Sequence, residues 1–211
     1  MKLFAAATLA GVLALGASSA QAATVMYHLT VNSPPACCGG TDYGTVTVTD
    51  ITGGFNISVA LASGVEVNAN GNSTHDALAF DLSGSGITFG NFVSTLGTGA
   101  SSEFAASGAI GNASPFGAFN NSVSFTGPNG NPSGVTSFSF DVTGTGLALG
   151  STVFDGFNVV FVADVFANGL TGNVAAITGG IPEPASWGLM ILGFGGIGAA
   201  LRTRRQRMAI A

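Results

Sequence analysis

The feature that most constrains the fold of this chain is the alternation of apolar and polar residues in short segments. Residues 25–31 and 55–61 carry an apolar side chain at every second position. Side chains two residues apart share one face of a β-strand, so this period indicates half-buried strands. The segments are separated by turn sequences such as Thr52-Gly53-Gly54, and no helical stripe occurs between residues 23 and 180. The pattern predicts an all-β domain, an antiparallel β-sandwich or jelly roll of about eight or nine strands.

Three further segments refine this prediction. Residues 157–166 are apolar at nearly every position, which is typical of a central strand covered on both faces. Threonines alternate with Val46 and Val48, and we expect the valines to point inward. Residues 99–120 are rich in Gly, Ala, Ser and Asn and are predicted to form a long loop. The β body is expected to span residues 23–170, with a linker at 171–180.

The distribution of charge excludes one class of partner. All five basic residues lie near the chain ends, at Lys2 and in the last ten residues, whereas residues 23–180 carry nine acids. Binding to nucleic acid needs Lys or Arg to neutralise phosphates. We therefore expect no nucleic acid partner. Charged residues make up only 7% of the chain, and the 33 glycines suit a turn-rich secreted β protein.

The N-terminus has the three parts of a secretory signal peptide. Lys2 precedes an apolar run at residues 3–17, and a small polar stretch then ends in Ala20-Gln21-Ala22. Small residues at Ala20 and Ala22 form the A-x-A pattern at which signal peptidase cleaves. The sequence predicts a signal peptide at residues 1–22 and export of the rest.

The C-terminus has the features of a short membrane anchor. Pro182, Glu183 and Pro184 precede Trp187, and residues 185–201 are apolar. At 1.5 Å per residue, this segment is about 25 Å long as a helix, the lower limit for one transmembrane span. A basic cluster follows at residues 202–207, and such clusters remain in the cytoplasm. The cluster consists of Arg202, Arg204, Arg205 and Arg207.

The order and spacing of these residues resemble the PEP-CTERM sorting signal, in the variant with Trp after the motif. The resemblance covers residues 181–207 and includes Gly193 and Gly195 in the apolar segment. It departs at Gly188, where that variant usually has Ala. The resemblance implies an inner-membrane precursor that an exosortase cuts near Pro-Glu-Pro, followed by release to the cell surface or the extracellular polysaccharide. An unprocessed membrane anchor has the same topology and remains the alternative. The tail also resembles the C-terminal region of ice-binding proteins, a resemblance that concerns the tail alone.

The two cysteines are adjacent in the sequence, at Cys37 and Cys38. Neighbouring Cα atoms lie about 3.8 Å apart, below the usual disulfide range, so a bond between them would be strained. An oxidising compartment favours disulfides. A vicinal disulfide, an intermolecular disulfide and free thiols all remain open.

One loop offers weak metal-ligand candidates. Asn70, Asn72 and Asp76 could supply oxygen atoms to calcium, but calcium loops usually contain several carboxylates, so a solvated turn is favoured. His75-Asp76 lies near no nucleophile elbow. We therefore expect no cofactor, no metal and no catalytic site.

These observations predict an exported, non-enzymatic surface or extracellular-matrix protein. A secreted carbohydrate- or calcium-binding module is the first alternative, and it would need exposed aromatics and clustered acids on a concave sheet face. A secreted hydrolase is the second alternative, and it would need carboxylates or a Ser/His/Asp set in one pocket.

Overall fold

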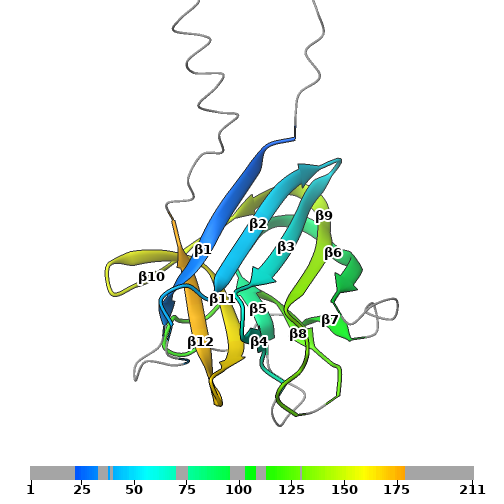
Figure 1. Cartoon of the computed structure of the whole chain (residues 1–211). Helices are drawn as coiled ribbons and strands as arrows, with labels where there is room; N and C mark the ends of the chain where they lie inside the picture. Colours follow the sequence, from blue (N-terminus) through cyan, green and yellow to red (C-terminus); the bar gives the residue numbers. More distant parts are fainter. Residues whose placement is uncertain are drawn as a thin grey trace, which may run out of the picture.

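The computed structural model describes residues 22–32, 38, 40–69, 76–95, 103–107, 113–128 and 130–178, which fold into twelve antiparallel strands (Figure 1). The all-β prediction is therefore confirmed. The strands are β1 (Thr24–Asn32), β2 (Gly44–Ile51), β3 (Gly54–Leu61), β4 (Val65–Val67), β5 (Asp76–Phe80), β6 (Leu82–Ser94), β7 (Phe104–Ser107), β8 (Asn121–Phe125), β9 (Ser137–Leu149), β10 (Thr152–Phe154), β11 (Phe157–Ala167) and β12 (Leu170–Ile177).

The strands form one continuous sheet in the order β6-β9-β3-β2-β1-β12-β11-β5-β8-β7, with β4 and β10 also paired to β11. The sheet is continuous because β1 has two partners. Its residues 24–28 pair with β2, and residues from Leu29 to Asn32 pair with β12. The sequence predicts a β-sandwich or jelly roll, and the structure has one continuous antiparallel sheet whose two halves are joined through β1. We call β6, β9, β3, β2 and β1 the first half of the sheet, and β12, β11, β5, β8 and β7, with β4 and β10, the second half.

The two halves curve over one another and enclose a single main core. Aromatic rings bridge strands that are not neighbours in the sheet. Phe138 of β9 stacks on Phe104 of β7 with ring centroids 4.7 Å apart, and Phe140 of β9 lies 6.0 Å from Phe80 of β5. Such ring pairs add to the stabilisation that burial of their apolar area provides.

The alternation predicted for β2 and β3 is confirmed. Val46, Val48, Ile57 and Val59 are buried in the main core. Thr45, Thr47 and Thr49 alternate with these valines and are partly exposed on the other face. The first half of the sheet therefore has an apolar inner face and a polar outer face, as half-buried antiparallel sheets do.

β11 is covered on both faces, as its sequence predicts. Phe161, Ala163 and Val165 belong to the main core, whereas Val159 and Val162 belong to a second cluster on the opposite face. The segment after residue 112 supplies Phe116 and Phe119 to that second cluster. Residues 113–120 thus cover the back of the second half of the sheet.

The prediction that the apolar residues of β1 all share one face is wrong for Val31. The sequence places Val31 on the same face as Tyr27 and Leu29. Tyr27 and Leu29 do contact the main core, but Val31 packs against the second cluster. The register along β12 shifts between Leu29 and Val31, which pair with the consecutive residues Ala176 and Ala175. A bulge of this kind adds one residue to a strand and reverses the side-chain alternation beyond it.

The predicted linker at 171–180 is wrong for most of its length, because β12 occupies residues up to Ile177 and buries Val174, Ala175 and Ala176. β11 turns into β12 through Asn168 and Gly169, whose φ angles are 53° and 78°. Positive φ at both positions is the geometry of a tight Asn-Gly hairpin turn. The body therefore extends beyond residue 170. The predicted loop at 99–120 likewise contains a strand, β7.

Candidate functional site

Most residues of the predicted sorting and cleavage signals lie outside the described part of the chain. These are Ala20, Pro182, Glu183, Pro184, Trp187, Gly193, Gly195, Arg202, Arg204, Arg205 and Arg207. Ala22 is described and exposed, two residues before β1. At the other end, the backbone N–H of Thr178 donates to the carbonyl of Asn158 at 2.7 Å. In the described ranges, no helix is long and apolar enough to span a membrane; the predicted helix at 185–201 lies outside them.

The described member of the calcium candidates, Asp76, begins β5. Its Oδ1 atom accepts hydrogen bonds from the hydroxyls of Ser122 and Ser124, at 2.6 and 2.9 Å. Both serines are on β8, which pairs with β5, so the carboxylate joins two strands. Asn70 and Asn72 lie outside the described residues. Within the described residues, no group of three or more His, Cys, Asp or Glu is placed to hold a metal ion.

Cys38 is disulfide-bonded and only 1% exposed. Cys37, its partner in the vicinal alternative, lies outside the described residues. The carbonyl of Cys38 accepts a hydrogen bond from Nδ2 of Asn168 at 2.8 Å. Cys38 therefore lies against the turn between β11 and β12.

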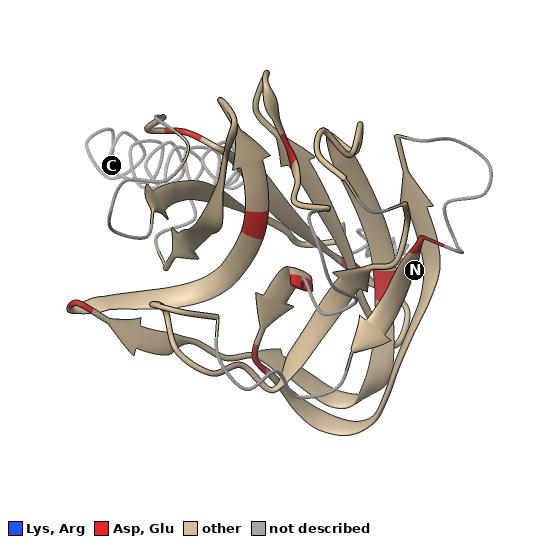
Figure 2. Cartoon of the chain, turned by 90° about the horizontal axis from the view of Figure 1, so that it is seen from below, with Lys and Arg blue, Asp and Glu red and all other residues tan. Residues whose placement is uncertain are grey.

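Carboxylates are spread over the fold, and the described residues include no Lys or Arg (Figure 2). Several carboxylates accept hydrogen bonds from neutral groups. Asp81 accepts from the Asn120 backbone and the Thr152 hydroxyl, at 2.8 and 3.1 Å. Both oxygens of Asp164 lie 3.1 Å from Nδ2 of Asn68. These contacts give Asp81 and Asp164 structural roles in joining loops to strands.

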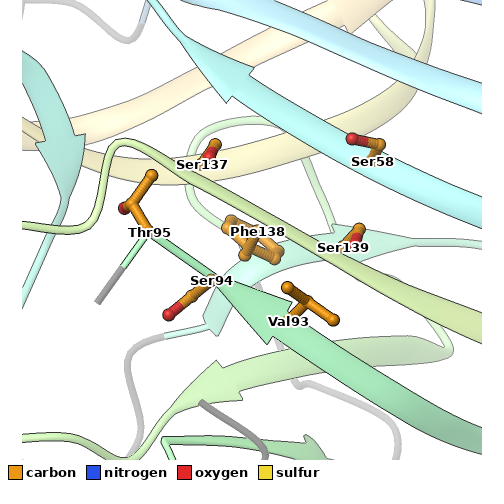
Figure 3. A pocket seen from close by; sticks show the side chains of 7 residues that line it. All are labelled: Ser58, Val93, Ser94, Thr95, Ser137, Phe138 and Ser139. Atoms are coloured by element: carbon orange, nitrogen blue, oxygen red, sulfur yellow. The ribbon is translucent and has the colours of Figure 1, made fainter. Parts of the chain in front are cut away.

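A shallow hollow of about 140 Å³ lies on the first half of the sheet, where the end of β6 meets β9 and β3 (Figure 3). It is lined by Ser58, Val93, Ser94, Thr95, Ser137, Phe138 and Ser139. Ser94 and Phe138 are buried, whereas Val93 is 59% exposed. Hydroxyl groups and one exposed aliphatic side chain thus meet at the rim.

Four of the lining residues belong to two rows of outward-facing residues that run across the strands. The first row follows the pairing of five strands and consists of Met26, Thr47, Ser58, Ser139 and Val93. The second row follows four strands and consists of His28, Thr45, Ala60 and Ser137. We call these nine residues the polar band. Strands are about 4.8 Å apart, so the first row is about 19 Å long.

Sequence reasoning missed this arrangement. The alternation Ser137-Phe138-Ser139-Phe140 shows that the two serines share one face. It does not show that β3 and β6 lie on either side of β9. That pairing joins residues far apart in the chain, and the three register shifts between β6 and β9 place Val93 beside Ser139.

The comparison with known families concerns the tail. Residues 180–205 match the PEP-CTERM protein-sorting motif. This confirms the resemblance found in the sequence, and the motif implies export, a membrane-anchored precursor and processing by an exosortase. No curated protein and no solved structure shows a significant match to the chain.

Proposed function

We propose that this chain is an exported, non-enzymatic protein of the cell surface or extracellular matrix, which its tail sorts and an exosortase releases. The observation that carries the proposal is the PEP-CTERM match at residues 180–205. The tail anchors the precursor in the inner membrane until it is cut near Pro182-Glu183-Pro184. Signal peptidase removes residues 1–22 at the other end.

The character of the body supports a structural or adhesive role in extracellular polysaccharide. Asp76, Asp81 and Asp164 bond neutral side chains or backbone groups that hold strands and loops together. The curved sheet provides a broad polar face on its first half. An extended surface of this kind suits association with a polymer better than enclosure of a small substrate.

The test is cell fractionation of a motif variant. Pro182, Glu183 and Pro184 are replaced together by Ala in the full chain, and Gln206→Ala serves as the control within the same tail. We expect the motif variant to accumulate in the inner membrane, while the control reaches the surface fraction. Recovery of the motif variant at the surface would contradict sorting through this motif.

The matrix role needs a separate measurement. The surface fraction is digested with enzymes that degrade the polysaccharide of the same cells, without protease. We expect digestion to release the protein into the soluble phase. A protein that stays attached to the cells after the polysaccharide is gone does not have the proposed location.

A further inference from the structure

The serine and threonine hydroxyls of the polar band make no side-chain hydrogen bonds with the described residues, unlike the polar groups of the two rows next to it. Ser58, Ser137 and Ser139 are partly exposed and make no side-chain hydrogen bond within the part of the chain that is described. The same holds for Thr45 and Thr47 on β2. Each hydroxyl can donate one hydrogen bond and accept two. The band therefore offers a row of unused donors and acceptors.

The neighbouring residues on the same face bond to one another. In the next row, Oδ1 of Asp141 accepts from Nδ2 of Asn56 at 2.7 Å, and its Oδ2 accepts from Nδ2 of Asn91 at 2.6 Å. Beyond it, the hydroxyls of Thr88 and Thr143 lie 2.7 Å apart. The band, which supplies four of the residues that line the hollow, therefore carries unused hydroxyls beside rows whose polar groups are already bonded.

The surroundings of the hollow select against anionic ligands. Glu103 lies beside the hollow, because its Oε2 accepts a hydrogen bond from the hydroxyl of the lining residue Ser94 at 3.4 Å. Asp141 is two residues from Ser139 on β9, and residues 23–180 carry nine acids with no Lys or Arg. An anionic sugar would be repelled and would find no Lys or Arg among residues 23–180 to pair with. A neutral sugar hydroxyl, in contrast, matches a serine or threonine hydroxyl as both donor and acceptor.

The hollow also provides one apolar contact. Val93 is 59% exposed and pairs with Ser139 across the β6–β9 ladder. A sugar ring has C–H groups on its faces and hydroxyls at its edges. A ring placed in the hollow could cover Val93 with C–H groups while its hydroxyls contact Ser58, Ser137 and Ser139.

We infer that the polar band is a binding surface for a neutral polysaccharide, with one sugar ring in the hollow and the chain running across β9, β3 and β2. This inference rests on the proposed matrix location and names the partner for it. Val93 is the one band residue among the large exposed apolar side chains of the described chain, and none of those in the band is aromatic. Because no aromatic ring stacks on the sugar, each sugar unit is held weakly. Affinity is therefore expected to rise with polymer length as successive units contact the row.

The experiment uses the full chain in mild detergent and measures retention in gels that contain a polysaccharide. The neutral probes are dextran, galactomannan and soluble hydroxyethyl cellulose, and the acidic probe is alginate. The test variant carries Ser58→Val and Ser139→Val, which remove two hydroxyls of the band and suit exposed strand positions. The matched control carries Thr88→Val and Thr143→Val, which remove two hydroxyls that bond each other on the same face.

We expect the native chain to bind at least one neutral probe and not alginate. The test variant should bind that probe about tenfold more weakly, whereas the control should match the native chain. Circular dichroism and thermal unfolding show whether both variants are folded; if the test variant is not, Ser137→Ala replaces it. Ser137 makes no side-chain hydrogen bond within the described chain, so the removal of its hydroxyl by Ser137→Ala should leave the fold intact.

Several results would overturn the inference: no binding to any of the three neutral probes, equal binding to alginate, or equal loss in the test and control variants. Self-association that the test variant abolishes would identify a second copy of the chain as the occupant instead. None of these results bears on sorting, which is judged from the location of the motif variant. Failure of the inference and failure of the proposed function are therefore distinguishable.

Discussion

Phe80 is the side chain through which the structure most directly predicts a loss of stability. It is fully buried on β5, and its ring lies 5.8 Å from that of Phe161, 6.0 Å from that of Phe140 and 6.2 Å from that of Phe89. These partners lie on β11, β9 and β6, so the ring contacts both halves of the curved sheet. Phe80→Ala would remove these contacts at once.

The magnitude follows from burial and from the cavity that remains. A buried Phe→Ala change costs about 3–5 kcal/mol, because the transfer energy of the ring is lost and its neighbours cannot fully close the space. A domain of this kind has about 5–15 kcal/mol of stability in total. With a urea slope of about 2 kcal/mol/M, the unfolding midpoint should fall by about 2 M.

The assay is urea unfolding followed by circular dichroism, with Phe157→Ala as the matched control. Phe157 is also on a strand but is 48% exposed, so its loss should cost less than about 1 kcal/mol. The slope of the transition should be the same for the native chain and both variants. A midpoint shift for Phe80→Ala no larger than that for Phe157→Ala would refute the packing of the two halves on one core.

Three further predictions concern backbone approach, ionisation and the disulfide. Gly54→Ala should destabilise the fold by about 1–3 kcal/mol in urea unfolding, because a Cβ there would collide with the carbonyl oxygen of Val142. A Cβ at Gly90 would meet nothing within 4 Å, so Gly90→Ala should be nearly neutral. Equal effects of the two changes would contradict the close approach of β3 and β9. Burial raises the pKa of Tyr27 above its ordinary value of 10.0, so the stability that its neutral form provides is complete below that value and declines as the pH rises through it towards the folded pKa. The urea midpoint of the native chain should therefore fall relative to that of Tyr27→Phe when the pH is raised from 8 to above 10, and a difference that stays constant would count against this linkage. Cys38 is buried and disulfide-bonded, so the native chain should take up no iodoacetamide before reduction. Rapid labelling of the native chain would show free thiols. A dimer that is lost on reduction would show an intermolecular disulfide.

The sequence predicts the strands of this protein well because each strand carries its own pattern. β2, β3 and β11 are visible in the alternation or the continuous apolar run of their residues, and their faces are those expected. β12 was missed because Gly172 and Asn173 resemble a linker, although Asn168-Gly169 is a strong signal for a hairpin turn and so for a strand after it. The reversal at Val31 was missed because a bulge depends on the partner strand, which the sequence does not name.

In the candidate site, too, linear features can be predicted from the sequence, whereas features that depend on strand pairing cannot. The sorting tail is a linear signal, and its residues can be recognised in order without any fold. The polar band is not linear, because Ser58, Ser139 and Val93 meet only through the pairing of β3, β9 and β6. Long-range pairing and register decide which outward side chains become neighbours. A surface of this kind therefore becomes visible only in the folded structure.

The central claim is that the chain is sorted through its PEP-CTERM tail and then released. The most direct measurement is the intact mass of the protein recovered from the surface of its own cells, with and without the exosortase. We predict a chain that begins after Ala22 and lacks the residues beyond about Pro184, and that the C-terminal trimming disappears when the exosortase is deleted. A surface protein whose mass still includes Trp187 and the terminal arginines would contradict the account and identify the tail as a permanent anchor.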